Sequence, residues 1–152
     1  MEVAGRGDSV RGAALKADKS WAHGGVGGWH LEVANEGGPL GNVVYGASAE
    51  AGIAAYEQAL ALDPANMSIA WQYAFQLAGF GGADRLARAS ELIGGITARK
   101  PRTALETILR DAALELKQAL DGGDMAAVSR IVALRLGRME PLDRPAATPG
   151  KR

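Results

Sequence analysis

The chain has 152 residues, of which 47% are hydrophobic and 22% charged, and its 17 basic and 17 acidic residues give a formal net charge of zero. This composition is typical of one globular domain with a core, and it excludes a disordered chain. The balanced charge provides no overall attraction to nucleic acid or to an anionic membrane, and the absence of cysteine excludes disulfides and thiolate chemistry.

Targeting segments are the next feature that bounds the function. The N-terminal residues have no apolar core of the length that a secretory signal needs, and about eighteen consecutive apolar residues occur nowhere. We therefore expect a cytoplasmic protein that does not enter a membrane. A periplasmic location would follow if the natural N-terminus lay upstream of Met1.

The first expected elements occupy the N-terminal third. A short helix over Asp8–Lys19 is expected to act as an N-terminal cap, and a second helix is expected around His23–His30. The segment from Glu36 to Ser48 carries four glycines and a proline. Because these residues favour turns, we expect an insertion loop over 36–48.

The clearest elements are two helices joined at Pro64. Apolar residues between Ile53 and Leu62 recur mostly at steps of three and four, which predicts one amphipathic helix. Pro64 lacks the N–H of a helical residue and disfavours helical dihedral angles at Asp63, so this helix should end there. A second helix of the same spacing should begin near Met67, giving two adjacent antiparallel helices.

The C-terminal part predicts a closing pair of helices. Thr103 and Glu106 form a capping-box pattern, followed by an apolar stripe that runs to Ala119 and ends at two glycines. Asp124 is expected to cap a last helix. After Gly137 the chain is rich in proline and arginine, so we expect a folded domain over 1–137 and a disordered tail over 138–152.

The helix–Pro64–helix joint resembles the tetratricopeptide repeat (TPR), a helix–turn–helix unit of about 34 residues. Gly52, Tyr56, Ala59 and Pro64 match the second helix of one unit, and Ala70, Tyr73, Ala74 and Leu77 match the first helix of the next. Ala89 to Pro101 repeats the step from Gly52 to Pro64. The resemblance implies an all-α fold, a right-handed solenoid of two to three helical hairpins with a C-terminal capping helix pair.

In the family that this chain resembles, the first helix of each unit lines a concave groove that binds peptides. The positions that this resemblance assigns to the groove are Trp21, Leu31, Ser68, Trp71 and Phe75. They lack the lysine and asparagine with which some members clamp a carboxylate, so an apolar protein segment is the expected ligand. The alternative is that the 36–48 insertion covers Trp71 and Phe75, because its own apolar side chains need burial.

The predicted function is that of a non-catalytic adaptor or scaffold that binds a protein or peptide partner, without cofactor or metal. One alternative is a self-associating scaffold, a homodimer in which the N-terminal flank pairs with a second copy. Another is a hydrolase or metal-dependent enzyme that uses His23, His30 and Glu32. The two histidines are seven residues apart, which separates them by about 10 Å on a helix and is too far for one metal ion.

Overall fold

The computed structural model describes residues 4–138, with side chains from Arg11 onward, and this part of the chain contains helices and no strand. The helices are α1 (Ala4–Tyr45), α2 (Ala49–Leu62), α3 (Met67–Phe80), α4 (Ala83–Ala98), α5 (Ala104–Asp121) and α6 (Met125–Arg135). The all-α prediction is confirmed. None of the helices in residues 4–138 is long and apolar enough to span a bilayer.

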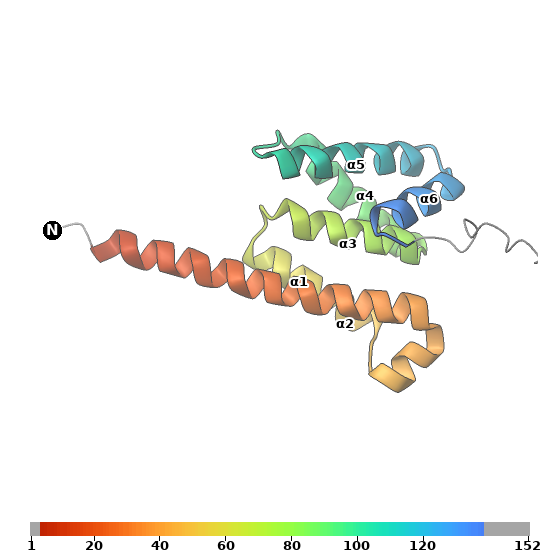
Figure 1. Cartoon of the computed structure of the whole chain (residues 1–152), viewed down its shortest axis with the longest axis horizontal. Coiled ribbons are helices and arrows are strands. Elements are labelled where there is room, and N and C mark those ends of the chain that lie inside the picture. The colour runs from red at the N-terminus through yellow and green to blue at the C-terminus, as the bar shows by residue number, and fades with distance from the viewer. Residues whose placement is uncertain (1–3, 139–152) are drawn as a thin grey trace, which may run out of the picture.

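Consecutive helices pack as three hairpins, α1 with α2, α3 with α4 and α5 with α6. Figure 1 shows α1, α3 and α5 as successive layers, with α3 in the middle. Helix α3 packs against all five other helices and carries the largest share of the core, including the fully buried Tyr73, Phe75 and Leu77. The core therefore runs through the middle hairpin and joins the other two to it.

Side-chain caps set the helix boundaries, and two of them, Thr103 and Asp124, were predicted. Helix α2 ends at Leu62, and α3 begins after Asn66, whose side chain accepts a hydrogen bond from the N–H of Ile69 at 3.1 Å. The hydroxyl of Thr103 accepts from the N–H of Glu106 at 3.1 Å, and a carboxylate oxygen of Asp124 accepts from Ala127 at 2.9 Å. These side chains satisfy N–H groups that the first helical turn leaves without a partner.

The N-terminal third differs from the expectation. Instead of a cap helix over Asp8–Lys19 followed by a separate helix, α1 runs without a break through this region. Ser20, at the expected break, is fully buried and its hydroxyl donates a hydrogen bond to the carbonyl oxygen of Ala59 on α2 at 2.9 Å. This contact and the packing of α2 and α3 along the next four turns stabilise a helix that glycine content alone disfavours.

The expected insertion loop over 36–48 is also largely helical. The only non-helical dihedral angles within α1 are at Gly38, with φ of 49°, and the helical conformation resumes and continues to Tyr45. Glycine reaches this conformation without steric cost, and Pro39 is tolerated at the start of a new helical turn. The loop proper is restricted to residues 46–48.

The C-terminal helix pair forms as predicted, and the folded part extends one residue beyond the predicted domain boundary. Arg138, the first residue of the predicted tail, donates from Nε to Oε1 of Glu32 on α1 at 3.0 Å. The rest of the predicted disordered tail, 139–152, lies outside the described residues.

Candidate functional site

One face of α1 is closed by the next hairpin. A Cβ atom on Gly24 would lie 3.3 Å from the side chain of Ile69, and one on Gly28 would lie 3.1 Å from the hydroxyl of Tyr56 and 3.2 Å from Nε2 of Gln72. Helices α2 and α3 therefore pack directly against the α1 backbone along this face. Glycine allows this approach, because any larger side chain would separate the helices.

Trp71 lies 47 positions after Gly24, and Phe75 lies 47 positions after Gly28. The two aromatic residues therefore occupy the face of α3 that corresponds to the Gly24–Gly28 face of α1. Phe75 is fully buried, and Trp71 stacks on it with ring centroids 4.1 Å apart. One turn further, a Cβ on Gly79 would lie 2.9 Å from Cγ1 of Val132 on α6. Gly79 therefore faces the third hairpin, whereas Phe75 belongs to the core and Trp71 packs against it.

The other groove candidates do not gather into one site. Leu31 is 1% exposed and belongs to the core, whereas Trp21 is 53% exposed and Ser68 is half-buried. These five positions therefore do not lie together on one exposed surface, and peptide binding at any of them stays a prediction. Consecutive hairpins stack head to tail: the Gly24–Gly28 side of α1 packs against the Ile69–Gln76 side of α3, and the side of α3 that carries Gly79 packs against α6.

The alternative that the 36–48 segment covers Trp71 and Phe75 is not what the structure shows either. The apolar side chains of this segment are exposed: Leu40, Val43, Val44 and Tyr45. The side of α3 that carries Gly79 is instead packed against α6, through Val132.

His30 and Glu32 take part in separate contacts, and His23 is half-buried on α1. Nδ1 of His30 accepts a hydrogen bond from the N–H of Ser48 at 3.3 Å, which ties α1 to the start of α2. Glu32 instead points toward α3 and Arg138. Within residues 4–138, no cluster of three or more histidine, cysteine, aspartate or glutamate side chains is placed to hold a metal ion.

Glu32 belongs to a polar network that connects all three hairpins. The hydroxyl of Tyr56 donates to Oε1 of Gln76 at 2.8 Å, and Nε2 of Gln76 donates to Oε2 of Glu32 and to the carbonyl oxygen of Gly28, both at 3.2 Å. Arg138 closes the network on Glu32 with both Nε and Nη2. Burial, followed by the nearby carboxylate of Glu32, raises the pKa of Tyr56 well above its ordinary range. Because these groups bind one another, we interpret the network as structural.

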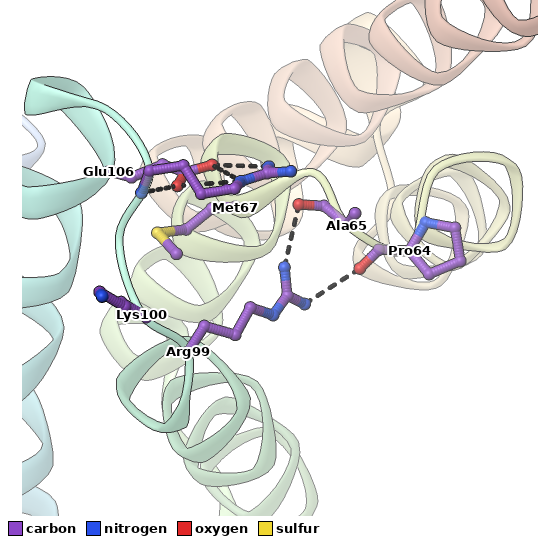
Figure 2. Close-up of a pocket in the computed structure, with 7 residues that line it drawn as sticks. Pro64, Ala65, Met67, Arg99, Lys100 and Glu106 are labelled. Carbon is purple, nitrogen blue, oxygen red and sulfur yellow. Dashed lines mark hydrogen bonds and ion pairs between the residues drawn. The ribbon is translucent and has the colours of Figure 1, made fainter.

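A pocket of about 490 Å³ lies between the α2–α3 and α4–α5 connections (Figure 2). The guanidinium of Arg99 donates to the carbonyl oxygens of Pro64 and Ala65 at 3.0 and 2.9 Å, and Arg102 forms an ion pair with Glu106 at 2.8 Å. Two of the cations that line the pocket are therefore already bound. Their contacts join one connection to the next, which is a structural role.

The outer surface of α1 carries an apolar stripe that no other described element covers. Leu15, Val26 and Trp29 are 57%, 49% and 48% exposed. These side chains lie within an arc of about 60° on the side of α1 opposite Gly24 and Gly28. The same arc also contains small or aliphatic residues, and we call the whole set the outer stripe: Leu15, Ala22, Val26, Trp29 and Val33.

The outer stripe occupies positions that are buried on α3. Ala22, Val26 and Trp29 lie 47 positions before Ile69, Tyr73 and Gln76. On α3 these three residues pack against the preceding hairpin: Ile69 against Gly24, Tyr73 stacked on Tyr56 at 4.6 Å between centroids, and Gln76 bonded to Gly28. The outer stripe therefore has the residue pattern of a surface on which another hairpin packs, but no described hairpin covers it.

The sequence contains a signal for this surface that the helix prediction missed. From Leu15 to Ala22, Val26 and Trp29 the steps are seven, four and three residues, which is helical spacing. Dividing the region into two helices near Lys19 obscured the pattern, because the stripe crosses that division.

Comparisons with known proteins add no relative. No family model, no curated protein and no solved structure matches this chain.

Proposed function

We propose that this chain is a non-catalytic helical-repeat protein of the TPR-like type that acts by binding another protein, as an adaptor or scaffold. The observation that carries the proposal is the outer stripe of α1. It is an apolar surface with the residue positions of a hairpin interface, exposed on α1 although the equivalent positions of α3 are buried.

The order of the hairpins supports the repeat interpretation. Helix α1 packs on α3 and α3 on α5, so the first helices of successive hairpins follow one another as they do in repeat proteins. Gly27 is buried on the side of α1 that faces α2, and Ala74, 47 positions later on α3, is also buried. In such an array each hairpin needs a neighbour on both sides or a polar capping face.

The polar side chains considered for catalysis are held in structural contacts, which favours a binding function over catalysis. Glu32 is held by Gln76 and Arg138, His30 accepts from the backbone of Ser48, and Arg99 is bound to carbonyl oxygens. The partner that fits the outer stripe is an apolar helical surface of another protein. The balanced charge of the chain favours neither nucleic acid nor a membrane as that partner.

The proposal is tested by affinity capture with tagged full-length chain and two matched variants. Trp29 and Trp21 are both exposed tryptophans on α1, but Trp29 lies in the outer stripe and Trp21 lies about 80° away from it. Trp29→Ala should abolish recovery of the bound protein, and Trp21→Ala should leave it unchanged. Recovery that is equal for wild type and Trp29→Ala would contradict the proposal.

A further inference from the structure

We propose that the occupant of the outer stripe is a second copy of this chain, with the two α1 helices packed antiparallel about a two-fold axis near Ala22. This inference rests on the proposed function and specifies its partner. Both proposals use the outer stripe as the binding surface. The present one adds which protein binds there and in which orientation.

The spacing of the outer stripe is self-complementary. Leu15 lies seven residues before Ala22, and Trp29 lies seven residues after it. In an antiparallel pair centred on Ala22, Leu15 of each copy is therefore level with Trp29 of the other. The small side chain of Ala22 lets the helices approach at the centre, and the two Leu15–Trp29 contacts flank that approach on both sides.

Charges beside the stripe favour the same pairing. Arg11 and Glu36 are both exposed and lie on the same flank of the outer stripe, near its opposite ends. Glu36 also forms an ion pair with Nε of Arg138 at 3.6 Å, and its side chain remains 63% exposed. In the antiparallel pair, Arg11 of one copy comes within about one helical turn of the level of Glu36 of the other, and the two-fold axis repeats this approach. In a parallel pair, Arg11 and Glu36 would remain near opposite ends of the seam and could not approach each other.

The length of α1 also favours a second α1 as occupant. Its N-terminal part extends beyond the body of the molecule (Figure 1), and most side chains from Arg11 to Lys19 are exposed. A helical segment of this length with glycine in it is marginal without packing. In the antiparallel pair this segment lies along the Val26–Val33 half of the other copy, so each copy supports the extension of its partner.

Sedimentation equilibrium of the full chain at micromolar concentrations tests the inference. The wild type and Trp21→Ala should form dimers, and Trp29→Ala should weaken the dimer by about tenfold or more, because each dimer loses two buried aromatic contacts. Circular dichroism should show that all three chains are folded, with Trp29→Ala losing at most the helix signal of residues 11–19. A wild-type monomer throughout the concentration range, or a dimer unaffected by Trp29→Ala, would overturn the inference.

Cysteine cross-linking tests the geometry in a chain that has no natural cysteine. Under mild oxidation Ala22→Cys should form a disulfide-linked dimer, because the two-fold axis places this position beside itself. Leu15→Cys should not, since the two Leu15 positions would be about 21 Å apart along the helices. Ser90→Cys, exposed on α4, is the control for random collision. Efficient Leu15→Cys linkage would overturn the antiparallel arrangement in favour of a parallel one.

Combining these results with the affinity capture separates the two proposals. If Trp29 is required to recover a different protein while the purified chain remains monomeric, the proposed function stands and the second copy is excluded. If Trp29 is required for neither, both proposals fail. The third hairpin exposes Leu105 and Ile108. If dimers form through these residues instead, the symmetric α1 pair is wrong and the copies stack end to end.

Discussion

Gly27 of α1 and Gly52 of α2 lie face to face where the first two helices cross. A Cβ atom on Gly27 would lie 3.0 Å from the carbonyl oxygen of Gly52, and a Cβ on Gly52 would lie 3.1 Å from the carbonyl oxygen of Gly27. A Cβ on Gly27 would also lie 2.7 Å from the ring of Tyr56. The backbones of α1 and α2 are thus in direct contact, and neither position has room for a side chain.

Replacing Gly27 with alanine should destabilise the protein although alanine is the better helix former. We expect a loss of about 1–3 kcal/mol in the free energy of unfolding, because the added methyl group overpacks the crossing. Gly25→Ala is the matched control, since a Cβ there meets nothing within 4 Å. It should stabilise the protein by about 0.5–1 kcal/mol. Urea unfolding of both variants checks this, and equal effects of the two substitutions would contradict the close crossing.

The joint at Pro64 could be predicted from sequence because its determinants are local. The proline, the cap at Asn66 and the spacing of the apolar residues all act within a few residues of the boundary. The closing pair α5 and α6 follows from similar local signals, which is why the all-α class was predicted correctly.

The continuity of α1 as one helix could not be predicted, because its glycines are required by contacts with residues that are distant in the sequence. Gly24, Gly27 and Gly28 look like turn residues in the sequence, yet they are the points at which α2 and α3 touch α1. The surroundings of the predicted groove positions could not be inferred from the sequence for a related reason. The side of α3 that carries Trp71 and Phe75 has an apolar pattern whether it faces a ligand or another hairpin, and only the position of the third hairpin distinguishes the two.

Gln76 should be far more important to stability than its neighbour Gln72. Gln76 is buried and accepts the hydroxyl of Tyr56 while donating to Glu32 and Gly28, whereas Gln72 is exposed. Gln76→Ala leaves these buried groups without partners and should cost about 1–3 kcal/mol. Gln72→Ala should change the free energy of unfolding by less than about 0.5 kcal/mol. Thermal unfolding compares the pair, and similar melting temperatures would argue against the network.

Arg138 should stabilise the fold by joining the end of the chain to α1. Its side chain is 21% exposed and that of Glu32 is 41% exposed, so solvent weakens the pair, and Arg138→Ala should cost only about 1 kcal/mol. The more exposed pair of Lys117 with Asp121 serves as the control, and Lys117→Ala should cost less than Arg138→Ala. Urea midpoints at low salt measure both. Indistinguishable midpoints for Arg138→Ala and wild type would contradict the link.

Stability should fall at alkaline pH because of two buried tyrosines. Burial raises the pKa of Tyr56 and Tyr73 above the ordinary value, and for Tyr73 a hydrogen bond to Glu57 adds to the rise. The folded protein then holds these protons more tightly than the unfolded chain does. Their contribution is complete below about pH 10, where the unfolded tyrosines are also protonated, and is lost as the pH rises above that.

Urea unfolding as a function of pH measures this alkaline loss. The double variant Tyr56→Phe, Tyr73→Phe is the control, since phenylalanine has no proton to lose. Its free energy of unfolding should decrease less than that of the wild type above about pH 10. Parallel decreases in the two proteins would show that other groups cause the loss.

The outer stripe of α1 is, on this account, covered by another protein surface. In a solution of the purified chain, that surface is the outer stripe of a second copy. Hydrogen exchange of the backbone amides of residues 11–19, measured at low and at high protein concentration, tests it most directly. We predict protection that increases with concentration in the wild type and in Trp21→Ala but is absent in Trp29→Ala. Rapid exchange of this segment at every concentration, with no dependence on Trp29, would contradict the account.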